Sequence, residues 1–281
     1  MKFQLKALVA ALAFVAAVPA QAAINHSLQG NSSFVLSIWD SAANISASFD
    51  LGKNYSDFNI KSPDFAISSI TATGTSFAFD LTAGDYATAW SNFAAVANEA
   101  NAEWAITAAD ALGNAAGTLG LITTYSGGEF QPLSSNGVTT AAALYDAYTQ
   151  NLGTIQSNYQ NHETPPLGGA PGVPNGANTA VAGTLSYAPT GYYDLGRNAG
   201  VGPNASGFVG QSLQLVQVLN GSSSRAQVTN TIFGNGAAFT LTSAGQLTYS
   251  AGLAPIPEAD TWAMMLLGLG FMGFVARRKQ A

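Results

Sequence analysis

N-I-S-A-S-F-D-L, residues 44–51, alternates polar and apolar side chains without a break. In an extended chain Ile45, Ala47, Phe49 and Leu51 would point to one face, and the polar residues between them to the other. A period of two is typical of a strand that has one face in the core and one face toward water. The spacing therefore predicts a half-buried β-strand over residues 44–51.

The stretch just before it, S-F-V-L-S-I-W at residues 33–39, shows the same alternation. Residues 41–43 separate the two stretches, and so short a connection predicts a hairpin of adjacent strands. Similar β-rich runs predict further strands over residues 76–81, 103–108, 119–125, 184–187, 212–219, 227–233, 238–242 and 247–250. The last two of these are expected to form a second hairpin that turns at residues 243–246.

Two segments have the period of a helix instead of a strand. Apolar residues spaced by three and four predict one long helix of about six turns. Its stripe consists of Val138, Ala141, Ala142, Tyr145, Tyr148, Leu152, Ile155 and Tyr159. A shorter helix is predicted over residues 86–98, with Trp90 and Phe93 turned inward.

Residues 164–178 are the strongest break in the pattern, with four of the 11 prolines. They form either a linker or a long ordered loop. We favour a loop, because neither side alone contains an obviously complete sheet. Many short strands with Gly-rich turns favour a mostly β fold, an antiparallel β-sandwich with one or two packed helices. It would form a single domain over residues 23–253.

The composition excludes several classes of function. Lys and Arg number 9 against 15 Asp and Glu, so no basic surface for nucleic acid can form. The chain has no Cys, which rules out disulfides and Cys-based metal or nucleophile sites. Charged residues are only 9% of the chain, so its surface must consist mainly of uncharged polar residues. Nothing in the sequence indicates a cofactor.

Residues 1–22 have the three parts of a secretory signal peptide. Lys2 and Lys6 supply a positive start, and residues 7–18 form an uninterrupted apolar run. Ala20 and Ala22 then give the small-x-small pattern that signal peptidase recognises. We expect cleavage after Ala22 and export across the inner membrane.

The other end of the chain has the pattern of a membrane anchor. Residues 262–276 are uncharged and mostly apolar, and Arg277, Arg278 and Lys279 follow them directly. A helix of this length spans about 22 Å, less than the ~30 Å of a bilayer's hydrocarbon core, so flanking side chains must snorkel. The basic cluster should stay in the cytoplasm. This predicts a single transmembrane helix with the domain outside and the C-terminus inside.

A Pro-Glu pair, Pro257 and Glu258, precedes that stretch, and Thr261 and Trp262 lead into it. Together with the apolar, Gly-rich run and the terminal basic cluster, residues 254–281 resemble the PEP-CTERM protein-sorting domain. The family's pattern is Pro-Glu-Pro, and Ala259 stands here at the second proline.

The resemblance implies that the chain is a substrate of exosortase, a membrane-embedded enzyme of Gram-negative bacteria. The cut would fall near Pro257 and Glu258, after which the protein would reach the envelope surface or the extracellular polysaccharide matrix. Proline restrains the residue before it, so Pro255 and Pro257 should keep the segment extended, as a protease-type site requires.

Catalytic and metal-binding patterns are absent from the sequence. His26 is expected in the N-terminal tail, and His162 at a helix end beside Glu163, without a second ligand nearby. The carboxylate pairs Asp50–Asp57 and Glu99–Glu103 have the residue type needed for glycoside hydrolysis, but acidic residues are numerous enough to form such pairs by chance. Calcium binding by loop carboxylates such as Asp57 or Asp64 is an alternative that the sequence leaves open.

Aromatic residues give a further alternative. Trp39, Trp90 and Trp104 are expected in the core, as tryptophans on strands usually are. Tyr192 and Tyr193 follow a loop-like stretch and are candidates for sugar contact.

These observations favour an exported cell-surface or extracellular-matrix protein with a structural or adhesive role and no catalytic residues. A carbohydrate-binding module of the exopolysaccharide matrix is the alternative, and a hydrolase of the envelope comes third.

Overall fold

The fold is built on one antiparallel sheet of eleven strands. The computed structural model describes residues 26–60, 70–113, 115–128, 134–152, 177–184, 186–189 and 202–252. The strands are β1 (Ser33–Asp40), β2 (Ile45–Asn54), β3 (Ser76–Asp80), β4 (Glu103–Asp110), β5 (Gly120–Tyr125), β6 (Ala177–Val181), β7 (Gly207–Phe208), β8 (Ser212–Leu219), β9 (Thr229–Ile232), β10 (Ala238–Leu241) and β11 (Gln246–Ser250).

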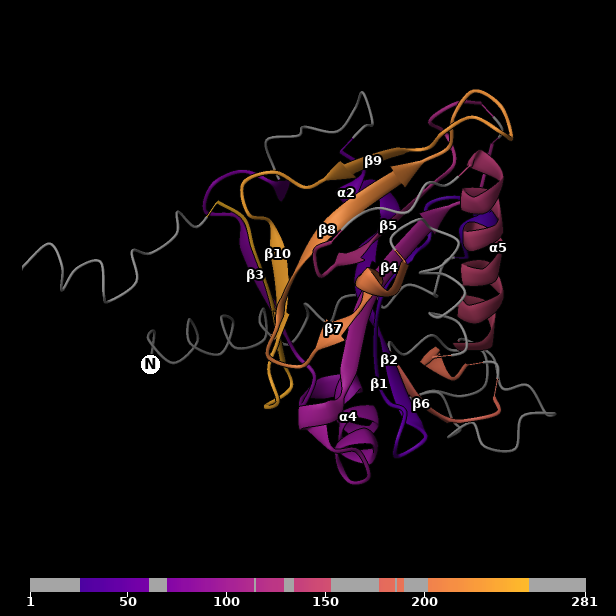
Figure 1. Cartoon of the computed structure of the whole chain (residues 1–281). Coiled ribbons are helices and arrows are strands. Elements are labelled where there is room, and N and C mark those ends of the chain that lie inside the picture. Colours follow the sequence, from indigo (N-terminus) through magenta and orange to yellow (C-terminus); the bar gives the residue numbers. More distant parts are fainter. Residues whose placement is uncertain are drawn as a thin grey trace, which may run out of the picture.

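Nine of these strands follow one another across the sheet in the order β3-β11-β10-β8-β5-β4-β1-β2-β6, and the sheet curls strongly into a half-barrel (Figure 1). The mostly antiparallel β class with packed helices is therefore confirmed, but the strands form one curled sheet instead of the sandwich expected from the sequence. Pairing is continuous from β3 to β6, and the chain closes its core by bending a single sheet.

Part of the bend lies along β8. β5 pairs with one edge of β8, while β9 and β10 share the other edge, β9 beside residues 216–219 and β10 beside residues 212–214. Between β9 and β10 the ladder is interrupted, and Asn235 and Gly236 take positive φ angles there. An interrupted strand bends more readily than a regular one, so this break helps the β10-β11-β3 end turn across the inner face.

The inner face of the curl holds the larger hydrophobic cluster. Rings from distant strands meet in it: Phe34 on β1 stacks on Phe58 with centroids 4.3 Å apart, and Phe58 in turn meets Tyr249 on β11. Phe58 belongs to the short helix α2 (Tyr55–Phe58). Helix α4 (Ala87–Ala94) packs against β2 and β6 at one end of the sheet (Figure 1). Its predicted inward residues, Trp90 and Phe93, are buried.

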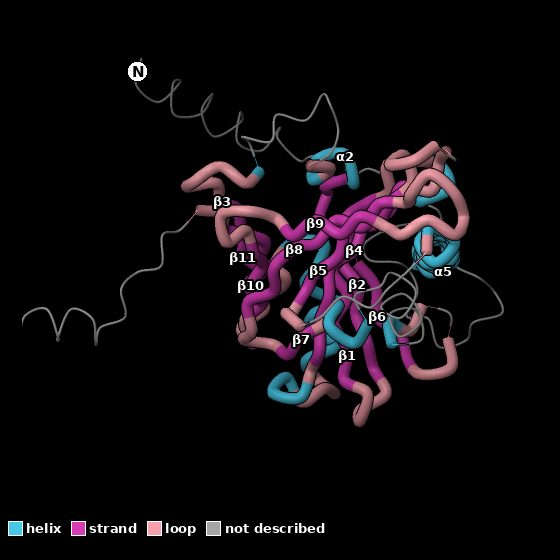
Figure 2. The backbone as a smooth tube through the Cα atoms, turned by 45° about the horizontal axis from the view of Figure 1, so that its top comes forward, coloured by secondary structure: helices cyan, strands magenta, loops and turns pink. Residues whose placement is uncertain are grey.

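Helix α5 (Ser135–Leu152) covers the outer face over β4, β5 and β8 (Figure 2). The predicted stripe is confirmed through Leu152, because its members within the described residues are all buried. Ile155 and Tyr159 lie outside the described residues. α5 and the inner cluster together place the central strands between two apolar layers.

This covering corrects the prediction for residues 44–51. The strand is confirmed, but it is not half-buried: Ser46, Ser48 and Asp50 on its polar face are buried, as Phe49 is on the other. Tyr148 of α5 lies over this polar face, and its hydroxyl oxygen is 2.5 Å from Ser48 Oγ. Small hydroxyl side chains fit closely beneath the helix and satisfy one another there.

Most of the predicted strands are confirmed with shifts of one or two residues at their ends. Both predicted hairpins are present as the pairs β1–β2 and β10–β11. The prediction over residues 184–187 is wrong, since Thr184 N–H donates to Val181 O and closes a turn instead. The strand lies earlier, at β6, and includes residues 177 and 178, which the sequence placed in the Pro/Gly-rich loop. Residues 164–176 lie outside the described residues.

Candidate functional site

The candidate site lies where β5 ends and β7 takes its place beside β4. β5 pairs with residues 107–110 of β4, and β7 pairs with the first two residues, where Glu103 faces Phe208 and Trp104 faces Gly207. A tight turn, residues 208–211, then leads from β7 into β8. β7 thus fills the space between the diverging ends of β4 and β8.

Two glycines allow this turn to form. The Gln211 N–H donates to Phe208 O at 3.0 Å, and Gly210, third in the turn, has a φ of 91°. A type II turn requires positive φ at that position, which favours glycine. At Gly207 a Cβ would lie 2.6 Å from Leu213 Cδ2 and 2.7 Å from Gln211 Oε1, so a larger residue would displace both side chains. The local sequence G-F-V-G-Q therefore determines the shape of the site.

Phe208 has a fixed main chain and an exposed ring. The buried indole of Trp104 donates from Nε1 to Phe208 O at 3.0 Å, and the Phe208 N–H donates to Gln211 Oε1 at 2.8 Å. The ring is nevertheless 48% exposed, and it is the one aromatic among the exposed large hydrophobic residues of the described chain. The fold therefore presents a phenyl ring to solvent on a rigid support.

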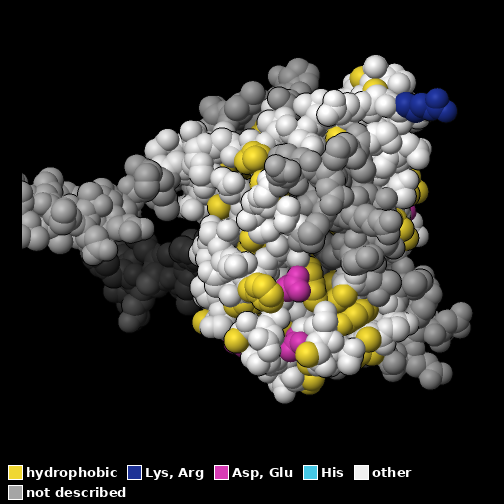
Figure 3. Space-filling model, viewed as in Figure 1, with side chains coloured by type: hydrophobic (Ala, Val, Ile, Leu, Met, Phe, Trp, Pro, Cys, Tyr) yellow, Lys and Arg dark blue, Asp and Glu magenta, His cyan; other side chains and the backbone are white. Residues whose placement is uncertain are grey.

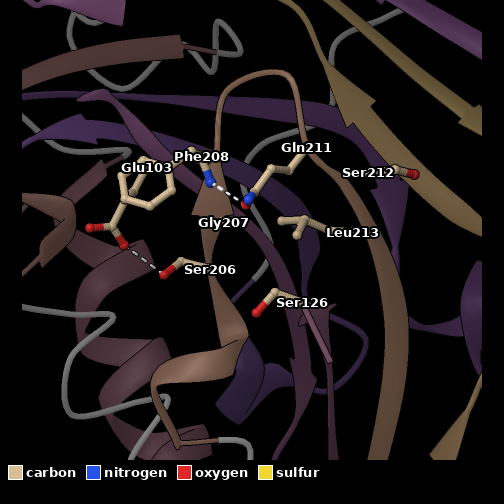
Figure 4. Close-up of a pocket in the computed structure, with 8 residues that line it drawn as sticks. All are labelled: Glu103, Ser126, Ser206, Gly207, Phe208, Gln211, Ser212 and Leu213. Carbon is tan, nitrogen blue, oxygen red and sulfur yellow. Dashed lines mark hydrogen bonds between the residues drawn. The ribbon is translucent and has the colours of Figure 1, made fainter. Parts of the chain in front are cut away.

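A hollow of about 600 Å³ opens beside this ring (Figure 4). Glu103 is half-buried in its wall and accepts a hydrogen bond from Ser206 Oγ at 2.8 Å. The remaining lining residues come from the ends of β5, β7 and β8: Ser126, Gly207, Phe208, Gln211, Ser212 and Leu213. The wall thus combines one carboxylate, several hydroxyl and amide groups, and an apolar surface.

A second hollow of about 500 Å³ lies on the other side of the same turn. Val209 and Gly210 of the turn line it, together with residues that follow α4, Asn98 and Glu99 among them. Within the described part of the chain, no Lys or Arg lines either hollow. The face in Figure 3 likewise shows few charged side chains among uncharged ones.

The structure separates the carboxylates that the sequence offered as pairs. Glu99 opens a short 3-10 helix, Glu99–Asn101, and Glu103 begins β4, so the two do not share a helix face. They line different hollows, with the turn between them. Asp57 caps α2 by accepting from Asn54 N–H at 2.9 Å, whereas Asp50 is buried in β2.

Asp50 is the carboxyl group most perturbed by its surroundings. Burial raises its pKa to about 6, against the opposing effects of hydrogen bonds from Gly52 N–H and Ser33 Oγ. It belongs to the packed sheet and lines neither hollow.

The tryptophan prediction is confirmed, since Trp39, Trp90 and Trp104 are all buried. His26 is not in a loose tail but contacts α5, with its Nδ1 3.3 Å from Thr149 Oγ1. The other predicted site residues lie outside the described residues: Ala20, Ala22, Asp64, His162, Glu163, Tyr192, Tyr193, Pro257, Glu258, Thr261, Trp262, Arg277, Arg278 and Lys279.

Sequence reasoning did not single out Phe208, Ser206 or Gln211. β7 has two residues, too few for an alternation to be read. The only local signal was the spacing of Gly207 and Gly210 around an aromatic residue, which is typical of a tight turn that displays a side chain.

Within the described ranges, His, Asp and Glu form no group of three that could hold a metal ion. Nor does that part of the chain contain a helix long and apolar enough to cross a bilayer.

Comparison with curated proteins and with solved structures found no match for this chain. One family model does match, the PEP-CTERM protein-sorting motif, over residues 255–279. This match confirms the resemblance carried by Pro257, Glu258 and the basic cluster. It implies an exported, membrane- or cell-surface-associated protein that exosortase processes. The chain therefore carries a PEP-CTERM protein-sorting motif at its C-terminus.

Proposed function

We propose that this chain is a structural or adhesive protein of the cell surface or extracellular matrix and that it acts without catalysis. The observation that carries the proposal is the sorting motif at residues 255–279, which begins five residues after β11 ends at Ser250. A sorting signal directly behind a folded domain identifies that domain as the exported cargo.

The ends of the chain supply the route. Residues 1–22 direct export, and signal peptidase removes them. The apolar residues 262–276 then hold the precursor in the inner membrane, with the basic cluster 277–279 on the cytoplasmic side. Exosortase cuts near Pro257 and Glu258, and the domain leaves for the envelope surface or the matrix.

The character of the domain supports a passive role. Two hydrophobic clusters fix both faces of one sheet. Residues 23–253 contain only 4 of the chain's 9 Lys and Arg and 13 of its 15 Asp and Glu, a net charge of −9, so the surface offers mainly Ser, Thr, Asn and Gln. A rigid, sparsely charged module of this kind suits contact with hydrated polymers better than binding of polyanions by charge.

The experiment compares the protein from its host with that from a host lacking exosortase. Fractionation and intact-mass measurement should find a form ending near Pro257 at the surface or in the matrix of the normal host. The host without exosortase should retain in its membranes a form that begins at Ala23 and ends at Ala281. Full-length chain in the cytosol, with residues 1–22 attached, would contradict the proposal.

The structural role is tested by deleting the gene and measuring cell adhesion and matrix cohesion. Both should fall, and the intact gene should restore them. A gene lacking residues 255–281 is the matched control, because its product should be released without reaching the surface. Unchanged adhesion and cohesion in the deletion strain would contradict the structural role and leave the sorting result intact.

A carbohydrate-binding module of the exopolysaccharide matrix is the second candidate function. It is favoured by the hollow beside Phe208, where an exposed ring lies next to hydroxyl, amide and carboxylate groups.

A further inference from the structure

We propose that the two hollows beside the turn 208–211 form one binding groove for an uncharged saccharide chain, with a sugar ring stacked on Phe208. This deepens the second candidate function, because it names the ligand class and the residues that bind it.

The Phe208 ring is exposed while its main chain is held. Trp104 and Gln211 fix the Phe208 carbonyl and N–H, and pairing with Glu103 fixes the strand. The next residue is held as well, since Val209 N–H donates to Ala102 O at 3.0 Å. An apolar ring on a rigid support loses little conformational entropy when a ligand covers it, which is the condition for a preorganised site.

Polar groups with free hydrogen-bonding capacity line the hollow beside the ring. Ser206 Oγ donates a hydrogen bond to Glu103 Oε2, while Glu103 Oε1 accepts no hydrogen bond from the described residues. Gln211 uses Oε1 to accept from Phe208 N–H, which orients its amide –NH₂ as a remaining donor. A hydroxyl group both donates and accepts. Neighbouring hydroxyls of a sugar can therefore bind the carboxylate and the amide while the apolar face of the ring covers the phenyl group.

The charge of the two hollows favours an uncharged ligand. Among the residues that the structure describes, the ionisable side chains that line the two hollows are Glu103 and Glu99, one in each. Two carboxylates without a basic partner in the walls disfavour uronates, sulfated sugars and phosphates. An uncharged saccharide is the ligand that meets no repulsion and needs no counter-charge.

The residues that the turn contributes to the two hollows favour a ligand longer than one sugar. The turn contributes Phe208 and Gln211 to one hollow and Val209 and Gly210 to the other. A chain laid across the turn would contact both hollows, whereas a single sugar would occupy one. The groove should therefore prefer oligosaccharides to monosaccharides.

The test measures binding of the processed protein, purified from its host, by calorimetry. The probes are the uncharged hexamers of cellulose, starch and mannan, an alginate hexamer as the anion and a chitosan hexamer as the cation. At least one uncharged hexamer should bind, more tightly than its monosaccharide and with little dependence on salt. The proposal would be overturned if none of the three uncharged hexamers bound. It would also be overturned if the alginate hexamer bound more tightly than they do, or if only the chitosan hexamer bound and its binding weakened with salt.

Variants locate the site. Phe208→Ala should weaken binding by about tenfold, the expected loss for one aromatic contact. Phe208→Trp should preserve binding, and Glu103→Gln should change it by less than about tenfold, because the amide oxygen still accepts. Leu112→Ala is the matched control, since Leu112 is an exposed apolar residue (61%) that lines neither hollow, and its variant should bind as the parent does.

Circular dichroism should show every variant folded, because the Phe208 side chain is largely exposed and contributes little to the core. If a hexamer binds and Phe208→Ala binds it equally well, the groove is wrong while the carbohydrate-binding function stands. Sorting and processing of Phe208→Ala should equal those of the parent, so failure of the groove is also distinguishable from failure of the sorting proposal.

Discussion

Asp50 shows how a single residue in this sheet couples stability to pH. Its pKa is raised by burial to about 6, above the unfolded value near 3.8. Between these values the folded chain binds more protons than the unfolded chain, so stability decreases as pH rises through that window. Above about pH 6 the ionised carboxyl is expected to cost about 2–3 kcal/mol.

Asp50→Asn should remove this cost. The amide keeps an oxygen to accept from Gly52 N–H and has a group that can donate to Ser33 Oγ. Urea unfolding at about pH 8 should therefore find the variant more stable than the parent by ~1–2 kcal/mol, with the difference vanishing near pH 4. Asp80→Asn is the control, because Asp80 is exposed and hydrogen bonds from Thr82 lower its pKa, so this variant should gain no stability at pH 8. An equal gain at pH 8 in that variant would show a general charge effect instead.

Single residues also show how far the candidate site follows from the sequence. The burial of Trp104 was predictable, because tryptophans on strands usually pack inside. The exposure of Phe208 was not, since it depends on a pairing between β4 and β7, whose paired residues are about a hundred positions apart. Glu103 was considered for its residue type, but the partner it was given, Glu99, lines the other hollow.

At the scale of elements, α4 closes one end of the curled sheet by packing Trp90 onto the β10–β11 turn. Gly245 of that turn has a φ of 75°, and a Cβ there would lie 2.9 Å from the Trp90 ring. Gly245→Ala should therefore both strain the turn and displace the ring. We expect a loss of about 2–3 kcal/mol in unfolding free energy, together with a change in tryptophan fluorescence.

Gly236→Ala separates the two effects. Gly236 also has a positive φ, 64°, but nothing lies within 4 Å of its added Cβ. The Gly236→Ala variant should lose only the part of the unfolding free energy that comes from backbone strain, about 1 kcal/mol, and its tryptophan fluorescence should be unchanged. Equal losses in the two variants would mean that contact between α4 and the turn adds nothing to stability.

Elements were predictable where they depend on local periodicity. The alternation in β1 and β2 and the stripe of α5 each follow from sterics within one segment. The burial of Ser48 could not be read in that way, because it depends on a helix about a hundred residues later in the chain. β6 was missed because Ala-Asn-Thr-Ala-Val has few large apolar residues and follows a Pro/Gly-rich run.

At the scale of the whole molecule, the pairings join the two halves of the chain. β2 pairs with β6, β5 with β8, and β3 with β11, so neither half completes a sheet alone. The domain should therefore unfold in one cooperative transition, with far-ultraviolet circular dichroism and tryptophan fluorescence giving the same midpoint. Two separated transitions would indicate that residues before and after 164–176 fold independently.

The sandwich prediction failed at this scale for a physical reason. Short strands with Gly-rich turns are common to sandwiches and to single curled sheets, since both bury one face of each strand. The difference lies in whether pairing continues around the bend, here along β8, where β9 and β10 follow one another on the same edge. Only the register of non-local pairs distinguishes the two folds.

The route of the molecule depends on the segment behind the domain, where Ala259 stands at the second proline of the family's Pro-Glu-Pro pattern. A proline at 259 would hold Glu258 extended before any enzyme binds, because it excludes helical conformations from its predecessor. Such restriction lowers the ordering cost by about 0.5–1 kcal/mol, or roughly two- to fivefold in rate. Ala259→Pro should therefore speed processing, and Ala259→Gly should slow it.

Pulse-chase labelling in the host, with precursor and processed forms resolved by mass, measures both rates. The two substitutions leave Pro257, Glu258 and the apolar stretch unchanged, so a difference between them reports the conformation of the segment. Slower processing of Ala259→Pro, or faster processing of Ala259→Gly, would mean that exosortase binds this segment in a conformation other than the extended one.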